Sequence, residues 1–250
     1  MPRGVVHQTR GARDVSPLLS EFERAVAGFD RSAFEPRRLS AAAAAWARRA
    51  SFEHASIAAF DRFALGLLAV GAPPELLEGA HVAAVEEIRH SRIGYALASL
   101  YGGEPLGPGP LDVSGALEGL GTLEELAVPA LVEGCVGETL SAIEAEESHR
   151  RATEPAAKLA LRIIADEEAR HAEYAWAFVR WAVETERALA VPLRRALGES
   201  LDRVRLADPG HGCEEVPLVE FGFLPRADRL DLQRTAARDV LTPAAAALFL

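Results

Sequence analysis

The sequence predicts an all-α protein: a four-helix bundle with one long crossover between its second and third long helices, plus extra C-terminal helices. Three observations lead to this fold class. Four long segments repeat apolar residues, mostly Ala, Leu and Ile, at the spacing of a helix. No alternating run of β-branched and aromatic residues bounded by turns indicates a strand. A Gly/Pro-rich stretch separates the second long segment from the third.

The first two long helices are expected to follow a polar arm. Residues 1–37 carry Gly and Arg and predict at most one short helix, over 16–29. The first long helix is predicted from about Ser40 to about Val70, where GAPP ends it, because Gly follows helix ends and Pro opens helices. The second is predicted over 74–100, up to YGG. A short turn between them predicts antiparallel neighbours.

The crossover is the stretch GGEPLGPGPLDVSGALEGLG at 102–121, which is too rich in Gly and Pro for a helix. Extended, it would reach about 60 Å, enough to follow a helix of about 40 Å from end to end. Thr122 is then expected to cap the third long helix, with Glu125 completing a capping box. This helix is predicted to run to about Arg150.

A break at ATEP leads to a fourth long helix, predicted over about 154–187, and a fifth helix is predicted over 192–206, before one or two short ones. We therefore divide the chain into three parts: an N-terminal arm (1–37), a four-helix bundle (38–188) and a C-terminal helical extension packed on the bundle (189–250).

Composition narrows the classes of protein. The net charge of −10 and the lack of a basic stripe argue against a nucleic-acid partner. The first residues lack the apolar core of a signal peptide, and no uncharged apolar run is long enough to span a membrane. The two cysteines, Cys135 and Cys213, give no disulfide framework. A cytoplasmic protein without a membrane partner is expected.

The pentad Glu-Glu-x-Arg-His occurs twice, at 86–90 and at 167–171, inside two apolar helices. On each long helix, alternating steps of four and three residues trace an otherwise apolar or small-residue seam that holds a carboxylate, and on two helices also a histidine. The seam residues are Glu53, Glu87, His90, Glu138, Glu168 and His171. Four buried carboxylates require cations. Two divalent metal ions would balance them and leave both imidazoles neutral as ligands.

One Glu from each of two helices and Glu-x-x-His from each of the other two resembles the ferritin-like superfamily of di-iron carboxylate proteins. The resemblance covers about residues 40–187. It implies a ferritin-like four-helix bundle in which Glu53, Glu87 and His90 from the first helix pair bind metal. From the second pair it implies the ligands Glu138, Glu168 and His171. The expected cofactor is two iron ions, with two manganese ions or a mixed Mn/Fe pair as the alternative.

Bacterial multicomponent monooxygenases of this superfamily carry Asp-Glu-x-Arg-His, in which the Asp hydrogen-bonds a ligand His. This chain is similar, with Glu in the Asp position. The residues that would then support the ligands are Glu86, Glu167, Arg89 and Arg170. On the third helix, Glu133 remains an alternative to Glu138 as the ligand. His211 and Cys213 lack spaced partners and predict no second metal site.

The resemblance implies a di-iron oxygenase or oxidase that activates O2 to hydroxylate, N-oxygenate or desaturate a small organic substrate. An electron donor such as a ferredoxin and a homodimeric assembly are further candidates. Small residues around Glu138 leave room for a substrate or for close helix packing. A ferritin-like iron-oxidising or iron-handling protein and a dimanganese catalase remain alternatives, as does a metal-free scaffold with its Glu paired to Arg. The sequence does not identify the substrate.

Overall fold

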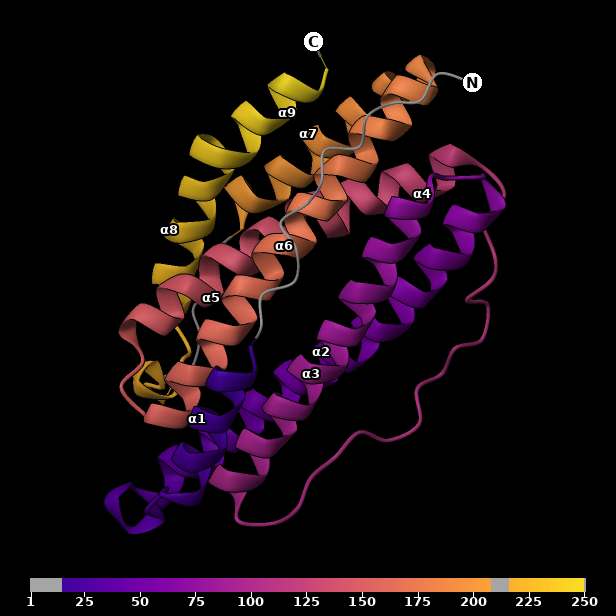
Figure 1. The fold of residues 1–250 in the computed structure, drawn as a ribbon. Coiled ribbons are helices and arrows are strands. Elements are labelled where there is room, and N and C mark those ends of the chain that lie inside the picture. Colours follow the sequence, from indigo (N-terminus) through magenta and orange to yellow (C-terminus); the bar gives the residue numbers. More distant parts are fainter. Residues whose placement is uncertain (1–14, 208–215, 250) are drawn as a thin grey trace.

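The computed structural model describes residues 15–207 and 216–249, and in these residues every regular element is helical (Figure 1). The prediction of an all-α chain is confirmed. His211 and Cys213 lie outside the described residues, as do residues 1–14 of the predicted arm. Four long helical segments dominate: α2 (Pro36–Ala69), α3 (Pro74–Gly102), a continuous helix built from α4 (Leu123–Pro129), η2 (Ala130–Glu138) and α5 (Thr139–Arg151), and α6 (Pro155–Thr185).

The helix starts follow the prolines and capping residues of the sequence. α2 begins at Pro36, earlier than the predicted Ser40, because proline supplies the φ angle of a first helical residue and needs no N–H partner there. The predicted capping box is present: Thr122 Oγ1 accepts from the Glu125 N–H, and the Glu125 side chain accepts from the Thr122 N–H. At the start of α6, the Glu154 carboxylate accepts from two backbone N–H groups.

α2 and α3 pack along each other as a hairpin, and α6 packs on α5, on η2 and on α3. Gly71, with φ of 66°, makes the turn between α2 and α3. The two helices approach closely at Gly94, where an added Cβ would lie 2.8 Å from Ala50 Cβ. This close contact sets the seams of α2 and α3 against the same core.

The predicted crossover has no helix and follows the α2–α3 hairpin from the end of α3 to the start of α4 (Figure 1). Gly103, with φ of 83°, ends α3. Near the other end of the crossover, Arg62 Nη2 donates to Glu118 O at 2.7 Å. The crossover therefore returns the chain to the end of the hairpin where α2 meets α3, and it is tied there by an arginine of α2.

The middle of the third long helix differs from the prediction. Residues 130–138 form a π-helix, whose hydrogen bonds join residues five apart in place of four. It follows Pro129, which lacks the N–H that a continued α-helix would use, and it contains Gly134 and Gly137. The sequence analysis used α-helical spacing throughout and missed this change of register.

By length and composition, the helix Leu123–Arg151 is the one segment of the described ranges that could cross a membrane, with a mean hydropathy of 1.4 over its most apolar window. No membrane span was predicted here, because no run of uncharged apolar residues is long enough. In the structure, its Leu126, Leu131 and Cys135 are buried in the core that it shares with α6 and the C-terminal helices. Internal packing accounts for part of its apolar composition, since 33 % of the most apolar window is buried.

The remaining helices flank this core. α1 (Ser16–Ala27) packs on α6, and α7 (Ala190–Leu206) packs on α4 and η2. α8 (Arg226–Ala236) continues through the π-helical η5 (Ala237–Leu241) into α9 (Thr242–Leu248). α8 and α9 lie on the side of α5 and α6 that faces away from α2 and α3 (Figure 1). Short 3₁₀ turns complete the list: η1 (Arg31–Ala33), η3 (Arg187–Leu189) and η4 (Val219–Phe221).

Candidate metal centre

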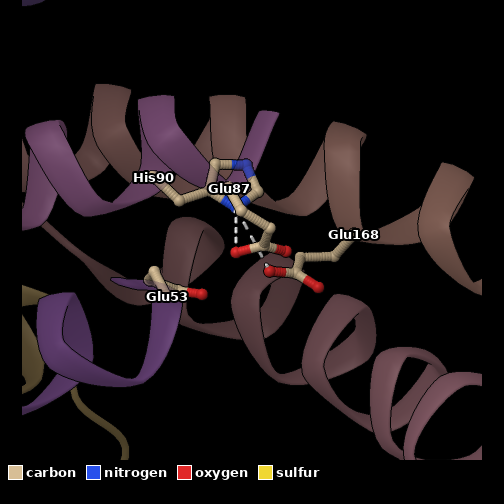
Figure 2. A group of neighbouring side chains, drawn as sticks. All are labelled: Glu53, Glu87, His90 and Glu168. Carbon is tan, nitrogen blue, oxygen red and sulfur yellow. Dashed lines mark ion pairs between the residues drawn. The ribbon is translucent and has the colours of Figure 1, made fainter. Parts of the chain in front are cut away.

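Six carboxylate and imidazole side chains from four helical segments meet in the core. One group consists of Glu53, Glu87, His90 and Glu168, whose potential ligand atoms all lie within 4.8 Å of one another (Figure 2). A second group, under the same limit, consists of Glu87, Glu138, Glu168 and His171. Both groups contain Glu87 and Glu168, so these two carboxylates lie between two adjacent positions for a cation.

The six residues are those predicted from the seams. α2 supplies Glu53, α3 supplies Glu87 and His90, and η2 and α6 supply the other three. His90 is 0 % exposed and Glu87 1 % exposed, so neither reaches bulk water. The seam spacing of four helices thus brings four acids and two imidazoles to one depth of the core, where their charges need compensation.

The two histidines are held in the same orientation. His90 Nε2 lies 2.9 Å from Glu167 Oε2, and His171 Nε2 lies 3.0 Å from Glu86 Oε2. A carboxylate can only accept, so each Nε2 carries a hydrogen, and Nδ1 is the nitrogen whose lone pair can bind a metal when the ring is neutral. His171 Nδ1 faces Glu87 Oε1 at 3.2 Å, and His90 Nδ1 faces Glu168 Oε1 at 3.4 Å. Both lone pairs therefore point into the cluster.

The two pentads support each other crosswise. Glu86 of α3 accepts from both Arg170 and His171 of α6, with the arginine Nη2 at 2.6 Å. In the same way, Glu167 of α6 accepts from Arg89 and His90 of α3. The first Glu of each pentad reaches the histidine of the other pentad. The first acid and the arginine of each copy thus form a bridge between the two helices.

Glu53 has an arginine partner, which was expected from the sequence only for a metal-free scaffold. Arg49 Nε donates to Glu53 Oε1 at 3.1 Å, one helical turn before it on α2. The i,i+4 spacing of an arginine and a seam carboxylate was the available signal. No described residue forms an ion pair with Glu138, which lines a cavity. The two groups therefore differ: one terminal carboxylate is held by a guanidinium, and the other faces open space.

Without cations, protons compensate the cluster. Burial and the nearby Glu168 carboxylate raise the pKa of Glu53 to about 7, and the same causes raise the pKa of Glu138 well above its ordinary value. Burial opposes ionisation of His171, but the Glu86 and Glu87 carboxylates outweigh it and raise its pKa to about 9. The pKa of His90 is raised in the same way by Glu167, Glu168 and Glu87, also against burial.

Four atoms of the cluster are buried without any hydrogen-bond partner: Glu87 Oε2, His90 Nδ1, Glu168 Oε2 and His171 Nδ1. An unsatisfied buried acceptor costs about 1–3 kcal/mol, and more when it is charged. Each of these atoms belongs to one of the two groups. Three carboxylates and one imidazole per group form the oxygen and nitrogen donor set that suits iron or manganese, so the residues fit a pair of such ions.

Glu133, the alternative third-helix ligand, belongs to neither group. It is exposed and lines a cavity of about 200 Å³ together with Glu138 and His171. Residues five apart stack on successive turns of a π-helix, which places Glu133 on the same side of η2 as Glu138. The structure thus separates the two acids: Glu138 lies in the cluster, and Glu133 lies one turn away along the cavity.

The other singled-out side chains have structural partners. Tyr174 Oη donates to Leu76 O at 2.6 Å, and Tyr95 Oη lies 3.2 Å from Ser51 Oγ, so both tyrosine hydroxyls have a partner within the protein. Cys135 is a free, buried thiol. His149 is partly buried, and its Nδ1 lies 2.8 Å from Lys158 O.

The described part of the chain is therefore an all-helical protein with a buried Glu/His cluster that could hold metal ions. Searches against models of protein families, curated proteins and solved structures find no match to this chain.

Proposed function

We propose that this chain is a ferritin-like, non-haem di-iron oxygenase or oxidase that acts with O2 on a small organic molecule. One observation carries the proposal. The two four-residue groups share Glu87 and Glu168, and both contain buried oxygen or nitrogen atoms that have no hydrogen-bond partner and could bind a metal. Glu53 and His90 would hold one iron ion and Glu138 and His171 the other, and Glu87 and Glu168 belong to both groups.

Charge balance supports two divalent ions. The four carboxylates of the groups carry four negative charges when ionised, and the imidazoles bind as neutral ligands through Nδ1. An iron pair bound here would supply two-electron chemistry with O2, and a manganese or mixed Mn/Fe pair fits the same donor set. Glu86 and Glu167 fix the tautomer and direction of the ligand imidazoles, and Arg89 and Arg170 donate hydrogen bonds to these two acids.

The cavity beside the second group favours an organic substrate over iron handling. Its walls include the apolar side chains of Phe60, Phe63 and Leu126, and its inner end reaches Glu138 and His171. Apart from Glu133, these walls offer a ferrous ion no carboxylate on its way to the cluster, whereas a small apolar molecule would bury its surface there.

Metal loading under argon followed by O2 tests the proposal. We expect two iron ions per chain, a Mössbauer spectrum of two coupled ferrous sites, and an optical change on mixing with O2 in a stopped-flow apparatus. The variant Glu87→Gln should lose both ions because both groups use this carboxylate, whereas the exposed Glu146→Gln on α5 should keep both. A chain that binds no iron pair, or a pair inert to O2, would contradict the proposal. Rapid peroxide disproportionation by the manganese-loaded chain would favour the catalase.

A further inference from the structure

The cavity beside Glu138 is lined by both apolar and charged side chains. Its inner end is closed by Glu138 and by His171, against whose ring Phe60 packs edge-on at 5.3 Å between centroids. Its walls are mostly apolar, and Phe63 continues the aromatic side. Arg62, half-buried, and Glu133, exposed, lie along the same cavity. A ligand inside would therefore meet carbon from the apolar walls and charge from Arg62 and Glu133.

The hydroxyl groups of the cavity are already engaged. Tyr174 Oη donates to Leu76 O at 2.6 Å, and Ser56 Oγ donates to Phe52 O at 3.2 Å. Neither has a hydrogen left to donate to a ligand. Apart from the cluster residues at the inner end, Arg62 and Glu133 are the lining groups that remain for recognition.

These two charges are of opposite sign and are not paired. No ion pair within 4.0 Å joins Arg62 to Glu133, and neither forms one with any other described residue. Arg62 uses one amino nitrogen for Glu118 O and Gly119 O of the crossover, which fixes the guanidinium and leaves its other N–H groups available. Glu133 accepts no hydrogen bond among the described residues. The cavity thus presents one fixed cation and one free anion.

We propose that this cavity binds a free amino acid with an apolar side chain. Its carboxylate would pair with Arg62 and its ammonium group with Glu133, while its side chain lies between Phe60 and Phe63 and points towards Glu138 and His171. The chemistry at the inner end rests on the proposed function, but the binding of the amino acid does not depend on it. It names the substrate class that the proposed function leaves open.

The size of the cavity fits this class. Its volume is about 200 Å³, and a cavity of about 150 Å³ is known to hold benzene in an engineered protein. One ring or a branched aliphatic side chain therefore fills the apolar part. A ligand with either charge missing would leave Arg62 or Glu133 without its partner, and sites built around charged hydrogen bonds discriminate strongly against such analogues.

Three matched probes test the two charges separately: phenylalanine, phenethylamine, which lacks the carboxylate, and hydrocinnamate, which lacks the ammonium group. The same three-way set is made for leucine and tryptophan. Isothermal titration calorimetry measures Kd for metal-free protein and for ferrous protein under argon. We expect at least one amino acid to bind roughly tenfold or more tightly than both of its truncated analogues.

Variants then assign each charge to its residue. Arg62→Gln should weaken binding of the amino acid and of the carboxylate analogue roughly tenfold, and leave the amine unchanged. Glu133→Gln should give the opposite pattern. Arg62→Lys should restore part of the carboxylate affinity. The exposed Arg180→Gln and Glu146→Gln, which lie outside the cavity lining, serve as matched controls and should change none of the Kd values.

The outcomes separate this inference from the proposed function. If no amino acid of the three sets binds, or if Arg62→Gln weakens all three probes equally, the inference is wrong, and Arg62 only tethers the crossover. Iron content is measured on the same samples. A chain that keeps the probe pattern but binds no iron pair would contradict the proposed function alone. A chain that binds two iron ions without the probe pattern would contradict the inference alone.

Discussion

Glu86 Oε2 accepts a hydrogen bond from His171 Nε2 at 3.0 Å, although the two residues belong to different copies of the pentad on different helices. Arg170, the neighbour of His171, contacts the other oxygen of the same carboxylate. These contacts oppose the effect of burial and hold the pKa of Glu86 below its usual range. Glu86 therefore stays an anion at neutral pH and fixes the imidazole of the opposite helix.

The variant Glu86→Gln tests this support. The neutral amide is a weaker acceptor for His171 and no longer pairs with Arg170, so metal affinity should fall by roughly 10–100-fold. Competition with a chelator of known affinity measures the loss. Glu78→Gln, an exposed position on the same helix, is the control and should leave affinity unchanged. Equal affinity of Glu86→Gln and the parent chain would show that the bridge does not orient the ligand.

Replacing the two acids of η2 one at a time should show which of them binds a metal ion and which only lines the cavity. Glu138→Gln removes the terminal carboxylate of the second group, and we expect the chain to retain about one ion of the pair. Glu133→Gln leaves both groups intact, and we expect two ions. Elemental analysis after gel filtration gives the metal-to-chain ratio. The reverse result would reinstate Glu133 as the ligand of the third helix.

Arg49→Gln should change the titration of Glu53 in the metal-free protein. Burial and the Glu168 carboxylate raise the pKa of Glu53 to about 7, and the Arg49 guanidinium lowers it from what it would otherwise be. Its removal should raise the pKa further, by about one unit. Carbon-detected NMR of the Glu53 carboxyl measures the shift. A lower pKa in the variant would mean that Arg49 does not act on Glu53 electrostatically.

The metal-free protein should lose stability as pH rises from about 6 to about 9. Glu53, with a folded pKa of about 7 above its ordinary 4.5, stabilises the fold fully below 4.5, and this contribution is lost as pH rises through 7. His171, with a folded pKa of about 9 above its ordinary 6.5, stabilises fully below 6.5, and its contribution is lost as pH rises through 9. Thermal unfolding across this range measures the decline.

The metal-loaded protein is the control for this pH series. Bound divalent ions replace the protons and require deprotonated ligands, so the gain in melting temperature on metal loading should grow with pH. A melting temperature of the metal-free chain that rises between pH 6 and 9 would contradict the assigned pKa directions.

Substitution of two glycines by alanine tests the helix packing, because we expect one to lower and the other to raise the free energy of unfolding. Gly94→Ala places a Cβ 2.8 Å from Ala50 Cβ and should destabilise the fold by roughly 1–3 kcal/mol through overpacking of α2 and α3. Gly198→Ala, on α7, meets nothing within 4 Å and should stabilise by about 0.5–1 kcal/mol through helix propensity. Urea unfolding measures both. A neutral Gly94→Ala would mean that the two helices separate easily.

The helices and the six cluster residues could be predicted because one simple periodicity governs both. A carboxylate such as Glu53 stands out on an apolar seam, and His90 three residues after Glu87 falls on the same face of a helix. Caps such as Thr122 mark helix starts by local chemistry alone. These signals depend on neighbours a few residues apart, which the sequence shows directly.

Other features depend on the arrangement of distant helices or on a local departure from α-helical geometry. The crossed pairing of Glu86 with His171 is set by how α3 and α6 face each other, which spacing along one helix does not reveal. The π-helix places Glu133 on the same side of the third long helix as Glu138, which α-helical spacing does not predict. The cavity between α2 and η2, lined by Arg62 and Glu133, appears only once these segments are packed.

The shared carboxylates make the two halves of the chain mutually dependent. The α2–α3 hairpin holds Glu53, Glu87 and His90, and the segments after the crossover hold the other three residues. Each group of four needs a carboxylate from the opposite half, and each histidine takes its supporting acid from there as well. A chain cut within the crossover would yield two pieces, neither of which contains one complete group. The centre is assembled as a whole or not at all.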